Sequence, residues 1–128
     1  MSDVSVKRVE EFDSPNEGGF CRARASLGVS SFGIQVENFP PHFEHFPEHD
    51  HLEDGQEEVY TAISGTAMLH AGGESHRLEP GVFARVGPGV IRKITTADEP
   101  VQLLAVGATP GQPYSPPPFT ELGAPLPG

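Results

Sequence analysis

Glycine and proline interrupt this chain so frequently that a long helix has no room to form. The 128 residues include 15 glycines and 14 prolines, and no long stretch combines a helical period with capping residues. Short runs that alternate apolar and polar residues lie between the turn signals, as in the strands of a sheet. The expected strands are two within residues 20–39, broken near 28–31, and then 57–63, 66–71, 74–79, 82–86, 90–95 and 101–106. Strands at this spacing, about 8–12 residues apart, predict an all-β sandwich or barrel.

We expect one domain with three parts. Residues 20–107 would form the β-barrel. Residues 1–19 would form an N-terminal arm, which is either an edge strand that pairs with the body or with a second subunit, or a frayed terminus. Residues 108–128 hold half of the prolines of the chain, so we expect an irregular or polyproline-like tail that either lies along the barrel or hangs free.

The charge of the chain excludes two classes of partner. The net charge is -10 at pH 7, and such a chain is repelled by phosphate backbones and anionic bilayers, so we expect neither nucleic acid nor a membrane as a partner. The first residues have no apolar signal region, and no apolar run is long enough to span a bilayer. Cys21 is the single cysteine, which fits a reducing compartment. Together these features predict a cytoplasmic protein.

Potential metal ligands gather in one stretch. His49 and His51 are two positions apart, and in an extended segment such side chains point the same way. Glu58 follows after a loop of six residues, 52–57, and can face the histidines once the chain reverses. Two neutral imidazoles and one carboxylate suit a divalent transition metal, Fe(II), Mn(II), Ni(II), Cu(II) or Zn(II), without a thiolate.

The order of these residues resembles the two sequence motifs of the cupin superfamily. The matching residues are His49, His51, Glu58 and Gly65 in the first motif and Gly81 and Gly89 in the second. The resemblance covers residues 49–96. It implies a double-stranded β-helix, also called a jelly-roll β-barrel, in a small single-domain member with a divergent second motif. It also implies a small-molecule ligand in the barrel mouth and a homodimer.

Arg92 stands where the family has its fourth ligand, a histidine. A guanidinium stays protonated and cannot ligate a metal. One reading keeps a three-ligand metal site of His49, His51 and Glu58, beside which Arg92 binds an anionic group of the substrate. In the other, Arg92 pairs with Glu58 and the pocket is metal-free.

Other residues near this stretch have open roles. Tyr60 shares a strand face with Glu58 and either fills the barrel or contacts the substrate as a proton donor. Glu57 faces away by strand parity, but it replaces Glu58 as the ligand if the loop register differs. His42 and His45 lie on a proline-rich loop and are either exposed or substitute ligands.

The function expected from these features is metal-assisted turnover of a small anionic metabolite in the barrel pocket. Two alternatives stay open. One is a non-catalytic small-molecule binder or sensor that uses the same pocket with or without metal, and the other is a structural dimer that binds no ligand. The residues that would carry out catalysis are not identified, because fold alone does not define function.

Overall fold

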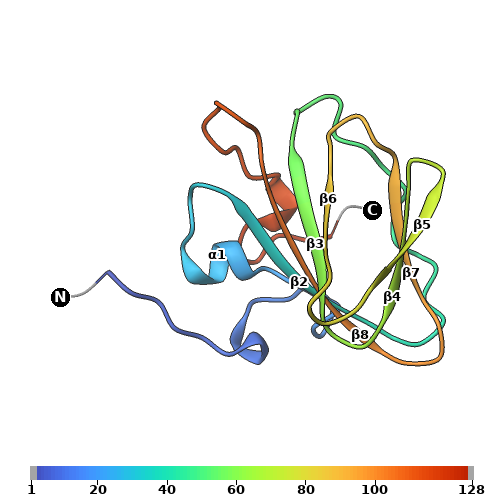
Figure 1. Cartoon of the computed structure of the whole chain (residues 1–128). Coiled ribbons are helices and arrows are strands. Elements are labelled where there is room, and N and C mark those ends of the chain that lie inside the picture. The colour runs from blue at the N-terminus through green and yellow to red at the C-terminus, as the bar shows by residue number, and fades with distance from the viewer. Residues whose placement is uncertain (1–2, 127–128) are drawn as a thin grey trace.

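Two antiparallel β-sheets face each other in this protein, whose computed structural model describes residues 3–126. The five-stranded sheet has the order β1-β2-β8-β3-β6 and the three-stranded sheet has the order β5-β4-β7. Figure 1 shows the two sheets as the two walls of a barrel. The strands are β1 (Phe20–Cys21), β2 (Gly33–Phe39), β3 (Glu57–Ser64), β4 (Ala67–Ala71), β5 (Glu74–Leu78), β6 (Phe83–Val86), β7 (Arg92–Thr96) and β8 (Val101–Ala108). The all-β jelly-roll fold expected from the sequence is therefore confirmed.

Three short helices of the described residues lie outside the sheets. They are the 3-10 helices η1 (Val9–Glu11) and η2 (Pro118–Thr120) and the α-helix α1 (Ala23–Leu27). None of the helices in the described part of the chain is long and apolar enough to cross a membrane.

The core lies between the inner faces of the two sheets. Leu78, Ile94 and Leu103 are fully buried there, and Tyr60 and Ala62 point into the same cluster from β3. Alternation along each strand explains this packing, because every second side chain faces inward.

The N-terminal region differs from the strands that we expect. A helix, α1, replaces most of the first strand of residues 20–39, because Ala23–Leu27 contains good helix formers and Gly28 ends the helix at φ 82°. Residues 3–19 contain η1 and no strand, so within these residues the arm adds no edge strand to the sheet. The expected strands from residue 57 onward are confirmed to within two residues at each end.

Two backbone relationships position the site. His49 and Arg92 form an isolated antiparallel bridge, with both main-chain hydrogen bonds present at 3.1 and 2.9 Å. Glu58 pairs with Gly107 of β8. A Cβ atom at Gly107 would lie 3.1 Å from Cγ of Glu58 and 3.0 Å from the Glu57 carbonyl oxygen. Glycine at this position therefore lets β8 approach β3 beside the site.

Candidate metal centre

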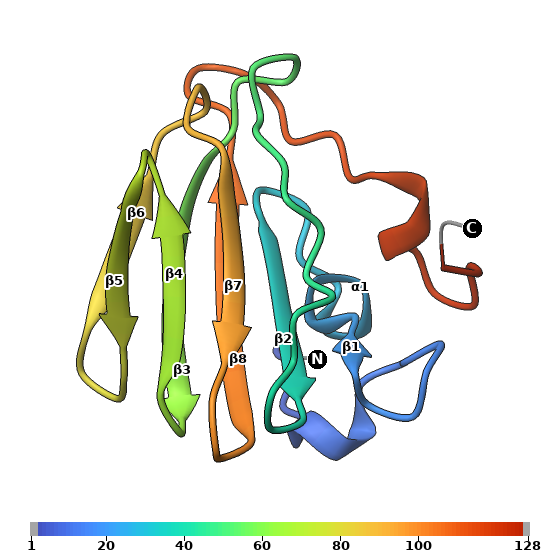
Figure 2. The ribbon, with the colours of Figure 1, turned by 90° about the vertical axis from the view of Figure 1, so that its right-hand side faces the viewer.

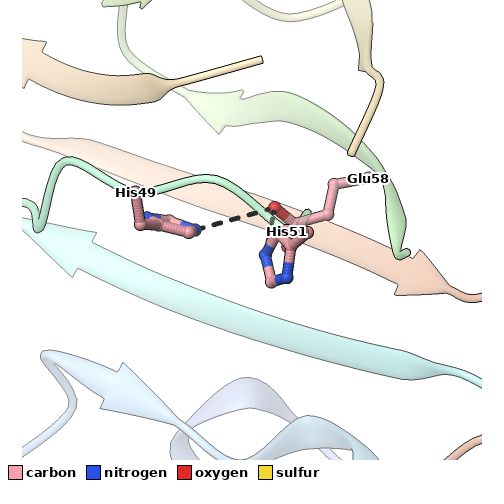
Figure 3. Close-up of side chains that lie close together, drawn as sticks. All are labelled: His49, His51 and Glu58. Atoms are coloured by element: carbon pink, nitrogen blue, oxygen red, sulfur yellow. Dashed lines mark ion pairs between the residues drawn. The ribbon is translucent and has the colours of Figure 1, made fainter. Parts of the chain in front are cut away.

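His49, His51 and Glu58 lie close together, as Figure 3 shows. Both histidines come from the loop between β2 and β3, and Glu58 is the second residue of β3. One ligand atom from each residue lies within 4.8 Å of the others. Nε2 of His51 is 3.1 Å from Oε1 of Glu58, and Nε2 of His49 is 3.9 Å from the same oxygen. The structure thus brings together the three ligands expected from the sequence.

The second nitrogen of each imidazole has a hydrogen-bond acceptor. Nδ1 of His49 lies 2.8 Å from the carbonyl oxygen of Pro47, and Nδ1 of His51 lies 3.1 Å from Oδ1 of Asp54. A carbonyl or carboxylate oxygen only accepts, so Nδ1 carries the proton in both rings. In the neutral tautomer, Nε2 then presents a lone pair toward Glu58, as in metal-ligating histidines whose other ring nitrogen is held by an acceptor.

Nε2 of His51 is buried and has no hydrogen-bond partner among the described residues. The nearby Glu58 oxygen is close enough but is not aligned for a hydrogen bond. A buried nitrogen without a partner is costly, and a divalent cation between this lone pair and the carboxylate would remove the cost. The donor set, two imidazoles and a carboxylate, also suits such an ion. The residues present therefore fit a metal.

The contacts of Glu58 keep its carboxylate ionised. Burial opposes ionisation, but the adjacent His51 imidazole, the Tyr60 hydrogen bond and the charge of Arg92 outweigh burial and hold the pKa of Glu58 below its ordinary value. Tyr60 donates to Oε1 of Glu58 over 2.5 Å. Burial first, and then the charge of Glu58, raise the pKa of Tyr60, so this hydroxyl stays a donor. The neighbouring Glu58 carboxylate raises the pKa of His51, and a metal would therefore compete with a proton there.

Arg92 is completely buried and also bonds to Oε1 of Glu58. Its Nε donates to the Val90 carbonyl oxygen over 2.9 Å, and Nη2 donates to the Gly87 carbonyl oxygen over 2.8 Å. Each of its three nitrogens thus has a partner inside the protein. The role of Arg92 as a substrate contact stays a prediction, and the contact that the structure provides is with Glu58.

A cavity of about 440 Å³ opens beside the three ligands. Glu37 of β2 lines it, together with Tyr60, His45 and all three candidate ligands. Burial first, and then repulsion from Glu58, raise the pKa of Glu37 to about 7. Our sequence reasoning missed this residue. The alternation along residues 33–37 could have located it, because Gly33 and Glu37 share one strand face, and that face turns to the cavity while Val36 packs on the other side of the sheet.

The remaining residues considered from the sequence lie apart from the three ligands. Glu57 pairs with Arg85, with 2.7 Å between its carboxylate and Nε of the arginine, as strand parity predicts. His42 is exposed and lies 3.4 Å from the Asp98 carboxylate. His45 lines the cavity without belonging to the ligand group.

A family model described as a cupin domain matches residues 35–107, more than half of the chain. A solved cupin protein from Bacteroides fragilis is 23% identical, with a TM-score of 0.69 and coverage of 91% of this chain and 93% of that chain. At this identity the likeness shows the fold. No curated protein matches the sequence.

Two solved enzymes are similar over part of their length. A sugar phosphate isomerase of the cupin superfamily from Silicibacter pomeroyi is 25% identical, with a TM-score of 0.61, over 70% of this chain and 59% of that chain. The DMSP lyase DddQ from Ruegeria pomeroyi is 25% identical, with a TM-score of 0.56, over 66% of this chain and 41% of that chain. The chain thus spans about half the length of these two enzymes.

Proposed function

This chain belongs to the cupin domain family, and from that premise we propose that it holds one divalent transition metal on His49, His51 and Glu58 and acts on a small anionic metabolite in the adjoining cavity. The observation that carries the proposal is the buried Nε2 of His51, which has no hydrogen-bond partner in the described part of the chain and faces an ionised carboxylate. The Pro47 and Asp54 contacts of the two rings support it further, because they leave both Nε2 atoms free to ligate.

When bound, the metal would supply Lewis acidity or a dioxygen site through its open positions. The protein would contribute orientation and a walled pocket. Asp54 holds the ring of His51, and Tyr60 and Arg92 hold the carboxylate of Glu58. Arg92, expected from the sequence as a substrate contact, would thus act on the metal through Glu58, whereas Tyr60 both bonds to Glu58 and lines the cavity.

Enzymatic turnover is supported by analogy. Two of the similar structures are a sugar phosphate isomerase and a DMSP lyase. Both are enzymes on the same fold, and a fold carries many activities. These relatives therefore support an enzymatic role without assigning its reaction class.

A second function, metal-free binding of a small molecule, is favoured by the contact between Arg92 and Glu58. This ion pair gives Glu58 a positive partner without any metal. A fixed cation beside Glu58 also repels a divalent ion, so the affinity for metal would be lower than in a site with a fourth histidine.

Metal content separates the two functions. The untagged protein is equilibrated with each divalent metal in turn, dialysed, and analysed by inductively coupled plasma mass spectrometry beside the double variant His49→Ala/His51→Ala. The matched control is His42→Ala, because His42 is exposed and lies outside the ligand group. We expect about one metal per chain in the parent and the control and background metal in the double variant. Background metal in all three folded proteins would overturn the metal proposal and leave the metal-free binder.

The homodimer implied by the family resemblance remains a proposal. Val59 and Ile63 of β3 and Phe83 of β6 are exposed on the outer face of the five-stranded sheet, and such a group of apolar side chains is often covered in an assembly. Light scattering on the full chain tests this, with twice the 13.7 kDa mass of one chain as the expected value.

A further inference from the structure

The C-terminal segment, residues 109–126, lies against the cavity, although it is outside the part of the chain that matches the family. Tyr114, Pro117, Phe119 and Thr120 of this segment line the cavity. Figure 2 shows the segment leaving β8 and crossing to the side of the barrel where α1 and β1 lie. A wall of the cavity is therefore supplied by a part of the chain outside the residues that match the family model.

A buried arginine holds this segment in place. Arg22 is 1% exposed, and its Nε donates to the carbonyl oxygen of Phe119 over 2.9 Å while Nη2 donates to that of Ala124. Its Nη1 pairs with Oδ2 of Asp13 at 2.7 Å, and the same oxygen accepts from the Gly123 amide over 3.1 Å. Charge-assisted bonds of this kind are stronger than neutral ones, so the path of the segment is specified and not incidental.

A glycine in the barrel makes room for the segment. A Cβ atom at Gly33 of β2 would lie 2.6 Å from the hydroxyl oxygen of Tyr114. The tyrosine ring thus packs directly onto the backbone of the inner strand face that also carries Glu37. Only a residue without a side chain permits this contact.

Aromatic rings border the cavity from both the barrel and the C-terminal segment. Phe46 stacks on the ring of His49, with 5.8 Å between ring centroids. From the other side, Phe119 packs on Phe20 at 5.7 Å between centroids. Aromatic surfaces bind flat apolar groups favourably, and the volume of about 440 Å³ is that of a site for a small organic ligand.

We propose that the C-terminal segment selects the ligand of this site, with Phe119 and Tyr114 as specificity-determining residues for small molecules that carry a flat, ring-sized apolar group. The inference deepens the proposed function, on which it rests for the metal-binding end of the ligand. No lysine or arginine of the described residues lines the cavity, so recognition at the segment depends on apolar and aromatic contact.

A neutral aromatic compound tests ligand binding by the C-terminal segment independently of metal binding. The probe is 4-fluorophenol, whose binding to the full-length protein is followed by fluorine NMR, both after chelator treatment and after zinc addition. We expect Phe119→Ala to weaken binding about tenfold or more in both states, because it removes a ring face from the site. The control is Leu122→Ala, since Leu122 lies on the same segment, is 60% exposed and does not line the cavity; this variant should bind as the parent does.

A second variant changes the position of Tyr114 by a substitution in the barrel. Gly33→Ala should displace the Tyr114 ring, because the new Cβ would lie 2.6 Å from its hydroxyl oxygen and 3.2 Å from its Cζ. The variant should weaken or alter binding of the same probe in a protein whose circular dichroism matches the parent. This variant keeps the proposal testable if Phe119→Ala does not fold.

The proposal is overturned if the parent does not bind 4-fluorophenol, or if both folded variants bind it with parental affinity. Metal content is measured on the same samples. If the protein holds its full metal content but neither variant changes the affinity for 4-fluorophenol, this inference is rejected and the metal site stands. If the variants weaken 4-fluorophenol binding but the protein holds no metal, the metal site is rejected and this inference stands.

Discussion

Arg92 bonds to Glu58 through a guanidinium that is 0% exposed. The residue at the position where the family resemblance implies a fourth ligand is thus bonded to Glu58, one of the three candidate ligands. The backbone bridge between His49 and Arg92 places position 92 beside the candidate ligands. A shorter, neutral metal-ligating side chain at position 92 would therefore also be directed toward the candidate metal position. The arginine therefore gives Glu58 a buried cationic partner at the position where the family resemblance implies a histidine, and a substitution there tests the proposed metal site.

Replacement of Arg92 by histidine should increase metal affinity by about tenfold or more, because it removes a cation and adds a ligand. Without metal, the loss of the buried pair with Glu58 should destabilise the protein by about 3–5 kcal/mol. Isothermal titration with zinc and urea unfolding measure the two effects. Arg92→Met is the matched control, because it removes the same charge and adds no ligand. Equal zinc affinity of the histidine and methionine variants would contradict a site at this point.

Asp54→Asn should weaken metal binding about 10–100-fold, the usual effect of removing a partner that orients a ligating histidine. The carboxylate of Asp54 accepts from Nδ1 of His51 at 3.1 Å, whereas an amide can offer a donor there and favour the wrong tautomer. Competition with a chromogenic chelator measures the change. Asp50→Asn serves as control, since Asp50 accepts from the Leu52 amide instead. Unchanged affinity in Asp54→Asn would show that the ring needs no such support.

Glu37→Gln should stabilise the metal-free protein at pH 8 and have little effect at pH 5. A carboxyl whose folded pKa is raised to about 7 binds more protons than the unfolded chain between pH 4 and 7, so its contribution to stability falls as pH rises through that window. The shift sets an upper limit of roughly 3 kcal/mol, which contact with cavity water reduces to about 1–2 kcal/mol. Urea unfolding at the two pH values tests this against Glu44→Gln, an exposed site. A variant that is less stable than the parent at pH 8 would refute the expectation.

Asp13→Asn should reduce stability at pH 7 and lose this effect in acid. The hydrogen bond from Arg22, and after it that from the Gly123 amide, lower the pKa of Asp13, so its contribution is present above the unfolded pKa of about 3.9 and disappears as pH falls through the lower folded value. Unfolding by urea at pH 7 and pH 3 measures the difference between variant and parent. The control is Asp98→Asn, because the side chain of Asp98 is 95% exposed. An effect that persists unchanged at pH 3 would exclude the ion pair as its source.

Period-two alternation and turn residues were sufficient to predict the strands from residue 57 onward, because both features are local. The three candidate ligands were also predicted, since a His-x-His pair and a glutamate after a reversal converge whenever the chain forms this barrel. The helix α1 was not predicted from the sequence, because its five residues are too few to show a helical period. Gly28, which ends the helix, is equally typical of a break between two strands.

Tertiary structure alone decided the roles that depend on long-range contacts. The sequence left open whether Arg92 meets a substrate or Glu58, because a long side chain goes where packing leaves it an acceptor, and here the acceptors are Glu58 and two backbone carbonyls. It did not predict that Glu37 faces the cavity, and it left open whether the C-terminal segment lies along the barrel. That segment is held by Arg22 through contacts about one hundred positions apart in sequence. The sequence by itself predicted the alternation of strands and the convergence of His49, His51 and Glu58, because the strands and turns that carry these residues follow from local patterns. The walls and charges of the pocket depend instead on which distant surfaces meet.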